Sequence, residues 1–143
     1  MRVVLDTNIL ISAALKPAGN EARVVMFGCL GRFQLCVSTE LEAEYRDVTQ
    51  RKKFIKQAKA LAALLSGMMS RAEHIAAAAH PAICGDPDDD MVLGCALSAR
   101  ADYLITGNLA DYPTGLSSPK IVNARQFLDS WDTKASTDEN SRG

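Results

Sequence analysis

The chain has 143 residues, the length of one globular domain, which excludes a multidomain enzyme with a separate cofactor module. Apolar residues make up 48% and charged residues 23%, as is usual for a folded protein, and no apolar run approaches the roughly 18 to 20 residues of a membrane helix. Sixteen Lys and Arg against seventeen Asp and Glu give a net charge of −1, which argues against wrapping of duplex DNA but leaves room for a local basic patch.

The N-terminal residues and the spacing of the cysteines and histidines exclude further classes of protein. The opening MRVVLDTN reaches an acid at Asp6 and so lacks a signal-peptide pattern, and we expect a cytoplasmic protein without membrane contact. The four cysteines form no C-x-x-C pair, and the two histidines cannot complete a common zinc pattern with them. Buried free thiols are therefore expected.

The first half of the chain alternates short apolar strands with helices. Thr7 or Asn8 is expected to cap the first helix. Ser38 or Thr39 caps the third, and Thr39 has the glutamate three residues later that makes a capping box. In chain order we predict a strand at Val3–Leu5, helices at 9–16 and 21–30, a strand at Phe33–Val37, and helices at about 39–51 and 54–69.

The second half contains an acidic helix start, two more strands and a last helix. Residues 71–81 have no clear periodicity, and no element is predicted there. We predict a helix from Asp86 to about Arg100, strands at Tyr103–Thr106 and Lys120–Val122, and a helix at 124–131. Residues 132–143, almost without apolar side chains, are expected to be a disordered tail behind a single domain of residues 1–131.

Strands that alternate with helices predict an α/β fold, a three-layer α/β/α sandwich with a central parallel sheet. In such sheets ligands bind beyond the carboxyl ends of the strands. Polar residues at those ends are therefore the first candidates for a functional site.

Acidic and polar side chains fall at these strand ends. Asp6 follows the first strand, and Thr106 and Asn108 stand at the end of the third strand. Glu44 lies beside the apolar face of the helix that follows the second strand. The run Asp86–Asp90 begins the helix that precedes the third strand. Converging carboxylates repel one another unless a cation lies between them. Oxygen ligands without suitable His or Cys favour Mg²⁺ or Mn²⁺.

Each of these residues also has a purely structural interpretation. Asp6 can be a helix cap, Glu44 a solvated residue, and the acidic run favourable charge at a helix N-terminus. Thr106 and Asn108 can be ordinary strand-end and turn residues. The functional interpretation is favoured because three acidic positions map to one sheet edge.

Four motifs follow one another along the chain: VVLDTNIL at 3–10, STELEAEY at 38–45, DPDDD at 86–90 with Leu93 and Ala96, and ADYLITGN at 101–108. Their order and spacing resemble the PIN domain, a metal-dependent ribonuclease fold found in toxins of bacterial and archaeal toxin–antitoxin modules. The similarity covers about residues 1–130 and is closest to the branch whose members are classed as toxin components.

The resemblance implies a metal-dependent endoribonuclease that hydrolyses phosphodiester bonds of single-stranded RNA with Mg²⁺ or Mn²⁺, has an antitoxin partner and forms a homodimer. It assigns catalysis and metal binding to Asp6, Glu44 and Asp89. Asp90 is a further metal ligand, and a shift of one residue in register would exchange it with Asp89. The residues expected to orient waters or phosphate oxygens are Thr7, Asn8, Thr106 and Asn108.

The chain departs from the family at Asn108, where PIN domains usually have an aspartate. Asparagine can hold a metal-bound water or an RNA phosphate, but it adds no charge. Arg51, Lys52 and Lys53 form a basic turn that either contacts the RNA backbone or is simply solvated. The alternative function is a catalytically inactive PIN-like protein that only binds a partner. A phosphoacceptor receiver domain is disfavoured, because no Asp ends a middle strand.

Overall fold

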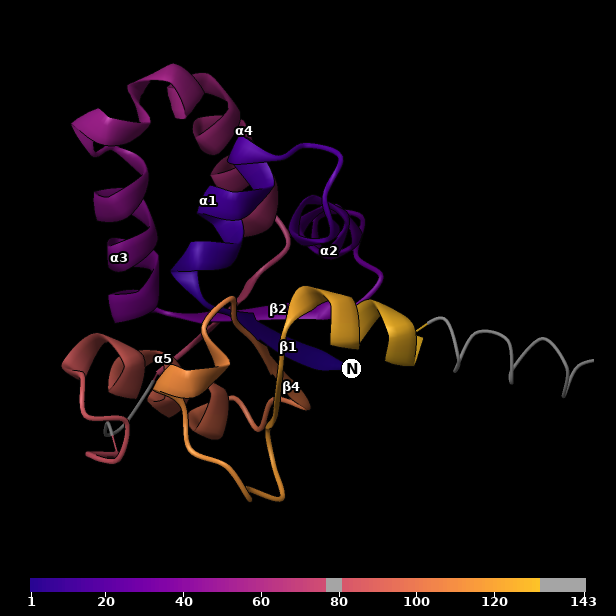
Figure 1. Ribbon diagram of the computed structural model, residues 1–143, viewed down its shortest axis with the longest axis vertical. Helices are drawn as coiled ribbons and strands as arrows, with labels where there is room; N and C mark the ends of the chain where they lie inside the picture. The colour runs from indigo at the N-terminus through magenta and orange to yellow at the C-terminus, as the bar shows by residue number, and fades with distance from the viewer. Residues whose placement is uncertain (77–80, 132–143) are drawn as a thin grey trace, which may run out of the picture.

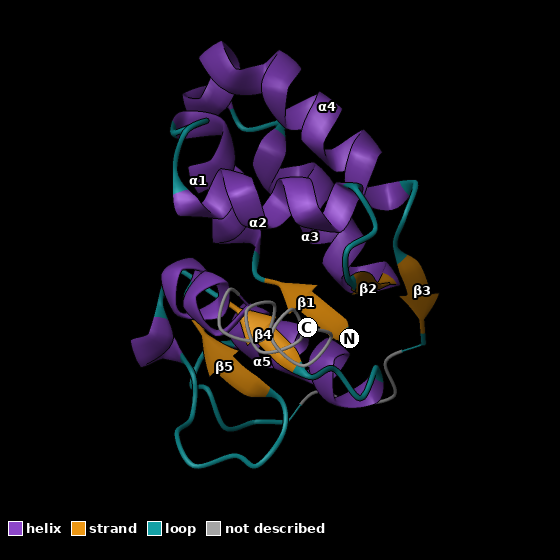
Figure 2. Ribbon diagram, turned by 90° about the vertical axis from the view of Figure 1, so that its right-hand side faces the viewer, coloured by secondary structure: helices purple, strands orange, loops and turns teal. Residues whose placement is uncertain are grey.

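The computed structural model describes residues 1–76 and 81–131, and its centre is a five-stranded sheet in the order β3-β2-β1-β4-β5 (Figure 2). Every neighbouring pair of strands is parallel, and Val3 of the central strand lies opposite Leu35 on one side and Tyr103 on the other. The strands are β1 (Arg2–Leu5), β2 (Gln34–Ser38), β3 (Glu73–Ile75), β4 (Tyr103–Ile105) and β5 (Lys120–Val122).

Helices cover both faces of this sheet, which confirms the predicted three-layer α/β/α sandwich. In Figure 1, α1, α2 and α4 lie on one face and α5 lies on the other. The helices are α1 (Thr7–Leu15), α2 (Asn20–Cys29), α3 (Thr39–Thr49), α4 (Ala58–Met69), α5 (Pro87–Ser98) and one at 124–131, with short 3₁₀ helices η1 (Lys52–Gln57) and η2 (Leu109–Asp111). In the part of the chain that is described, no helix is long and apolar enough to cross a membrane. The tail expected at 132–143 lies outside the described residues.

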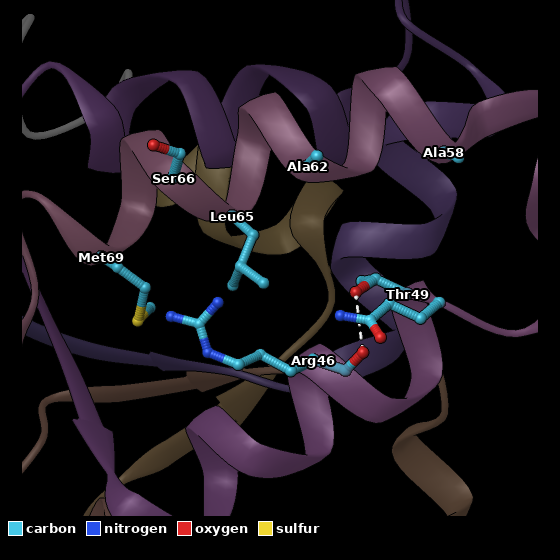
Figure 3. Close-up of a pocket in the computed structure, with 8 residues that line it drawn as sticks. Arg46, Thr49, Ala58, Ala62, Leu65, Ser66 and Met69 are labelled. Carbon is cyan, nitrogen blue, oxygen red and sulfur yellow. Dashed lines mark hydrogen bonds between the residues drawn. The ribbon is translucent and has the colours of Figure 1, made fainter.

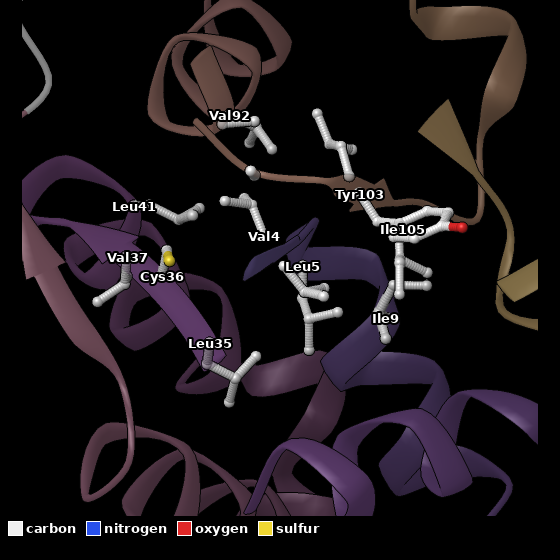
Figure 4. Close-up of a cluster of buried hydrophobic side chains, with 14 of the residues drawn as sticks. Val4, Leu5, Ile9, Leu35, Cys36, Val37, Leu41, Val92, Tyr103 and Ile105 are labelled. Carbon is white, nitrogen blue, oxygen red and sulfur yellow. The ribbon is translucent and has the colours of Figure 1, made fainter. Parts of the chain in front are cut away.

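The core forms around the central strands because their apolar side chains are covered on both faces. The run Val3–Leu5 is fully buried, and Figure 4 shows the side chains of Val4 and Leu5 among those of β2, β4 and the flanking helices. The helix at 124–131 joins this core through Phe127, whose ring meets Tyr103 edge-on with the centroids 5.2 Å apart. All four cysteines are free, as expected, but only Cys36 and Cys95 are fully buried.

Two elements differ from the sequence expectation. Strand β3 was not predicted, because Glu73 and His74 are exposed and only Ile75 supplies an apolar side chain. Its backbone nevertheless pairs with β2, and Glu73 forms an ion pair with Arg2 at 2.5 Å. The helix expected at 54–69 begins only at Ala58, since the chain first forms η1 with a kink at Phe54.

The structure also decides which residues cap the helices. The N-cap position of α1 is Asp6 and not Thr7 or Asn8, and the Asp6 side chain makes no capping hydrogen bond. For α3 the cap is Ser38, whose Oγ accepts the amide proton of Leu41 at 3.1 Å. The capping box at Thr39 is therefore wrong.

Replacing Ser38 by alanine should lower the free energy of unfolding by about 1 kcal/mol, because a buried amide at the start of α3 loses its acceptor. Thr39→Ala is the matched control and should cost clearly less, since Thr39 is exposed and does not cap the helix. Urea unfolding of both variants measures the difference. Equal losses would show that the Ser38 hydroxyl does not stabilise the helix start.

Candidate active site

The candidate site lies at the carboxyl edge of the sheet, where the direction of the chain connections changes. The links from β1 to β2 and from β2 to β3 run over the face of α1 and α4, whereas α5 connects β3 to β4 over the opposite face (Figure 1). The switch point is thus between the neighbouring strands β1 and β4, which is where open α/β sheets bind ligands. Asp6 directly follows β1, and Thr106 directly follows β4.

Asp6 is a buried carboxylate held by donors from distant parts of the chain. The residue is only 8% exposed. Its Oδ2 accepts hydrogen bonds from Thr106 Oγ1 at 2.9 Å and from the Tyr112 hydroxyl at 2.8 Å. Burial raises the pKa of Asp6 above its ordinary value, while the bonds from Tyr112 and Thr106 act in the opposite direction. Asp6 is therefore an anchored acid at the end of β1.

Glu44 reaches the same edge from the helix that follows β2. The neighbouring Tyr45 is buried and donates its hydroxyl proton to the carbonyl of Leu5, which fixes α3 against the end of β1. The Thr7 hydroxyl donates to Glu44 Oε2. Burial raises the pKa of Glu44, the bond from Thr7 lowers it, and the charges of Asp88 and Asp6 raise it further. Asp6 and Glu44 therefore lie close enough to repel each other.

The two candidate aspartates of α5 are used differently. Burial, followed by the charges of Asp6 and Asp111, raises the pKa of Asp89 to about 6. Asp90 is buried, and its Oδ1 accepts the amide protons of Ile83 at 3.1 Å and Cys84 at 2.8 Å. Asp89 thus lies close enough to Asp6 to be repelled by its charge, whereas the Asp90 carboxylate accepts hydrogen bonds from the loop before α5.

Two further side chains at this edge were not expected from the sequence. Tyr112, 5% exposed, donates to Asp6, and Asp111 lies in η2 within the electrostatic reach of Asp89. Asp111 stands three residues after Asn108, the uncharged position of the fourth motif. A signal was present, since an acid closely follows the end of β4. Nothing in the local pattern, however, predicts that η2 turns back over the sheet edge.

The remaining polar candidates mainly bond to the protein. Asn8 Oδ1 accepts the amide proton of Gly107 at 2.9 Å, which joins the loops after β1 and β4. The amide of Asn108 donates to Thr106 Oγ1 at 3.0 Å, and the Asn108 side chain is exposed. Asn8 and Thr106 thus support the geometry around Asp6, and Asn108 is the one of these polar side chains that faces solvent.

A separate cavity of about 460 Å³ between α3 and α4 does not belong to this site (Figure 3). Arg46 is its one charged lining residue, and that side chain is paired with Glu42 at 2.8 Å. None of the lining residues is an acid, a histidine or a cysteine, so the cavity offers neither metal ligands nor a base to activate the hydroxyls of Thr49 and Ser66.

The donor set at the sheet edge fits a hard divalent cation in its chemistry. The candidates Asp6, Glu44 and Asp89 offer only oxygen ligands, and the charge of Asp6 raises the pKa of the other two, so a cation between them would relieve this repulsion. As the side chains stand, no three His, Cys, Asp or Glu residues within 1–76 and 81–131 are grouped tightly enough to hold an ion. The acids converge on one edge but do not form a closed cage.

The fold and the site together define a class, that of parallel α/β domains with carboxylates at the switch point of the sheet. Residues 2–110 match the family described as the PIN domain, and the chain therefore belongs to the PIN-domain family. Proteins of this family are generally nucleases that use divalent metal ions.

A chain of the crystal structure of VapBC2 from Rickettsia felis bound to a DNA fragment from their promoter has a similar fold, with a TM-score of 0.55 and 19% sequence identity. The alignment covers 86% of this chain and 98% of that one. At this identity the likeness establishes the fold alone. No curated protein sequence matches the chain.

Removing the Tyr112 hydroxyl should destabilise the protein at neutral pH by about 1.5 to 3 kcal/mol, because a buried carboxylate loses a charge-assisted hydrogen bond. That bond lowers the pKa of Asp6, so Tyr112→Phe should raise it. The deficit should be complete above the pKa of Asp6 and shrink as falling pH protonates the carboxyl group. Unfolding free energies measured from pH 4 to 8 test this.

Tyr103→Phe is the control, since it removes a hydroxyl from an equally buried tyrosine whose partner is the uncharged Ser130 at 3.3 Å. Its cost should be smaller and independent of pH. A pH-independent deficit in Tyr112→Phe as well would contradict a bond to ionised Asp6.

Proposed function

We propose that this PIN domain is a divalent-metal-dependent endoribonuclease that cleaves single-stranded RNA in the cytoplasm, as the toxin of a toxin–antitoxin pair. One observation carries the proposal. Glu44 and Asp89 come from α3 and α5, and the charge of Asp6, at the end of β1, raises the pKa of each. Membership of a family of nucleases supports the reaction class.

In this proposal Asp6, Glu44 and Asp89 hold Mg²⁺ or Mn²⁺, which would polarise the scissile phosphate and activate a water nucleophile. Thr106 and Tyr112 keep Asp6 in place through Oδ2. Since the pKa of Asp89 is about 6, this carboxyl group is mostly ionised at neutral pH and ready to act as a ligand. A bound cation would favour its charged form further.

The supporting polar residues divide into two roles. Thr7 holds Glu44, and Asn8 joins the loops after β1 and β4, so both would act through the acids. Asn108, with its exposed side chain, would orient a water or a phosphate oxygen. Asp90 would serve the loop before α5 and not the metal, although the sequence included it among the ligands.

An antitoxin partner is part of the proposal because the structural neighbour belongs to the VapBC2 toxin–antitoxin complex. A homodimer is proposed as well, and it rests only on the resemblance to the family. A catalytically inactive PIN-like binding protein is the competing function, and the experiments below separate it from a nuclease.

Asp89→Asn should remove most RNA cleavage, because the substitution neutralises a proposed metal ligand. Asp90→Asn should cost little cleavage, since the amide oxygen of asparagine can still accept the bonds from Ile83 and Cys84. Rates of cleavage of a single-stranded RNA with added Mn²⁺, normalised to folded protein, give the ranking. The reverse ranking would make Asp90 the ligand.

Asp6→Asn tests the metal centre without a substrate. In a chelator the variant should be at least as stable as the wild type, because it removes a buried charge and keeps an acceptor for Thr106 and Tyr112. Mn²⁺ at a hundredfold excess over its dissociation constant should stabilise the wild type by about 2.7 kcal/mol and the variant much less.

Melting curves of both proteins with and without Mn²⁺ supply the measurement. Equal shifts in the two proteins would remove Asp6 from the metal centre. No shift in the wild type, combined with no cleavage, would favour the inactive binding protein.

A further inference from the structure

A long stretch of the chain carries only positive charge. Residues 48–72 contain no Asp or Glu but include six basic side chains, in a protein whose net charge is −1. Five of them lie within nine residues at the turn between α3 and α4, and all five are exposed. We name this set the basic turn, and its members are Arg51, Lys52, Lys53, Lys56 and Lys59.

Little of this positive charge is neutralised inside the protein. Arg51 pairs with Asp47 at 3.2 Å, but both side chains are largely exposed, and Lys53 lies over the ring of Phe54 at 5.1 Å. Lys52, Lys56 and Lys59 form no ion pair with any residue that the structure describes. Exposed uncompensated cations at this density favour a polyanionic ligand.

The basic turn is joined to the carboxylate site by α3. Figure 1 shows α3 running from the edge of the sheet to this turn. Arg51 follows Glu44 by seven positions, which corresponds to about 10 Å along a helix. A cleft of about 500 Å³ spans that interval, and both residues line it together with the acids Glu40, Asp47 and Asp88.

The basic turn can offset the repulsion between the acidic site and a polyanionic substrate. The carboxylates of Asp6, Glu44 and Asp89 would repel RNA phosphates approaching the sheet edge. A row of cations at the far end of α3 would attract the same strand and hold it along the cleft. The protein then needs no overall positive charge, because the attraction is local.

We infer that the basic turn binds the phosphate backbone of single-stranded RNA and leads the strand along the cleft beside α3 to the carboxylates. The inference rests on the proposed ribonuclease function and adds where the substrate lies. It assigns Lys52, Lys56 and Lys59 to backbone contacts, which are independent of base sequence.

The test compares two triple variants that each remove three exposed positive charges. Lys52→Gln/Lys56→Gln/Lys59→Gln changes the basic turn, and the control Lys16→Gln/Lys120→Gln/Arg125→Gln changes exposed positions elsewhere. Binding of a fluorescent single-stranded RNA is measured by anisotropy from 50 to 300 mM salt, with a chelator present to prevent metal-dependent cleavage. Thermal melting checks that both variants fold as the wild type does.

The basic-turn variant should bind RNA about tenfold or more weakly at the low end of this salt range. The slope of log affinity against log salt should fall by about 2, since each lost contact to a single strand removes roughly 0.7. The control should keep the wild-type slope and affinity.

Equal losses in the two variants would show that binding follows net charge, and unchanged binding in both would place the RNA elsewhere; either result overturns the inference. A wild type that binds no RNA overturns it as well and leaves the basic turn to an acidic protein partner. Because the assay needs neither metal nor cleavage, these outcomes are separate from failure of the Mn²⁺ melting test.

Discussion

The structure depends on a buried carboxylate, that of Asp6, at the carboxyl ends of the neighbouring strands β1 and β4. An ionised Asp6 loses its hydration there, and this is tolerable only because hydroxyl groups from distant segments bond to it. Thr106 brings the end of β4 to that oxygen, and Tyr112 brings the segment after η2. One desolvated acid therefore joins the end of β1 to a segment that lies about a hundred residues further along the chain.

Glu44 and Asp89 oppose folding because the charge of Asp6 repels both, and the protein tolerates this repulsion because packed elements position them. Tyr45 fixes α3 to the end of β1 and so presents Glu44. Asp89 and Asp90 are neighbours on α5, where successive side chains point about 100° apart, so one can face the acids while the other bonds the preceding loop. The length of α3 separates this acidic edge from the basic turn at the other end of that helix (Figure 1).

Much of the fold was predictable because it depends on local pattern. The apolar run Val3–Leu5, and those of the other buried strands, predicted a parallel sheet with helices on both faces, and the structure confirms it. The missed strand is β3, whose exposed Glu73 and His74 carry no apolar signal and whose existence depends on backbone pairing with β2. The choice between Ser38 and Thr39 as the cap of α3 could not be made either, since both have the required side chain and only the turn out of β2 selects one.

For the site, the sequence by itself determined which acids stand at the strand ends, and with them the family and the class of metal that such ligands suit. It did not reveal that Tyr112 bonds Asp6, that Asp111 adds a charge near Asp89, or that Asp90 is bonded to its own loop. Those relations join residues across long separations or depend on the rotation of a helix about its axis. Only packing of the finished sheet, with η2 folded back over its edge, decides them, because periodicity reports which face of an element is apolar and not which distant side chain it meets.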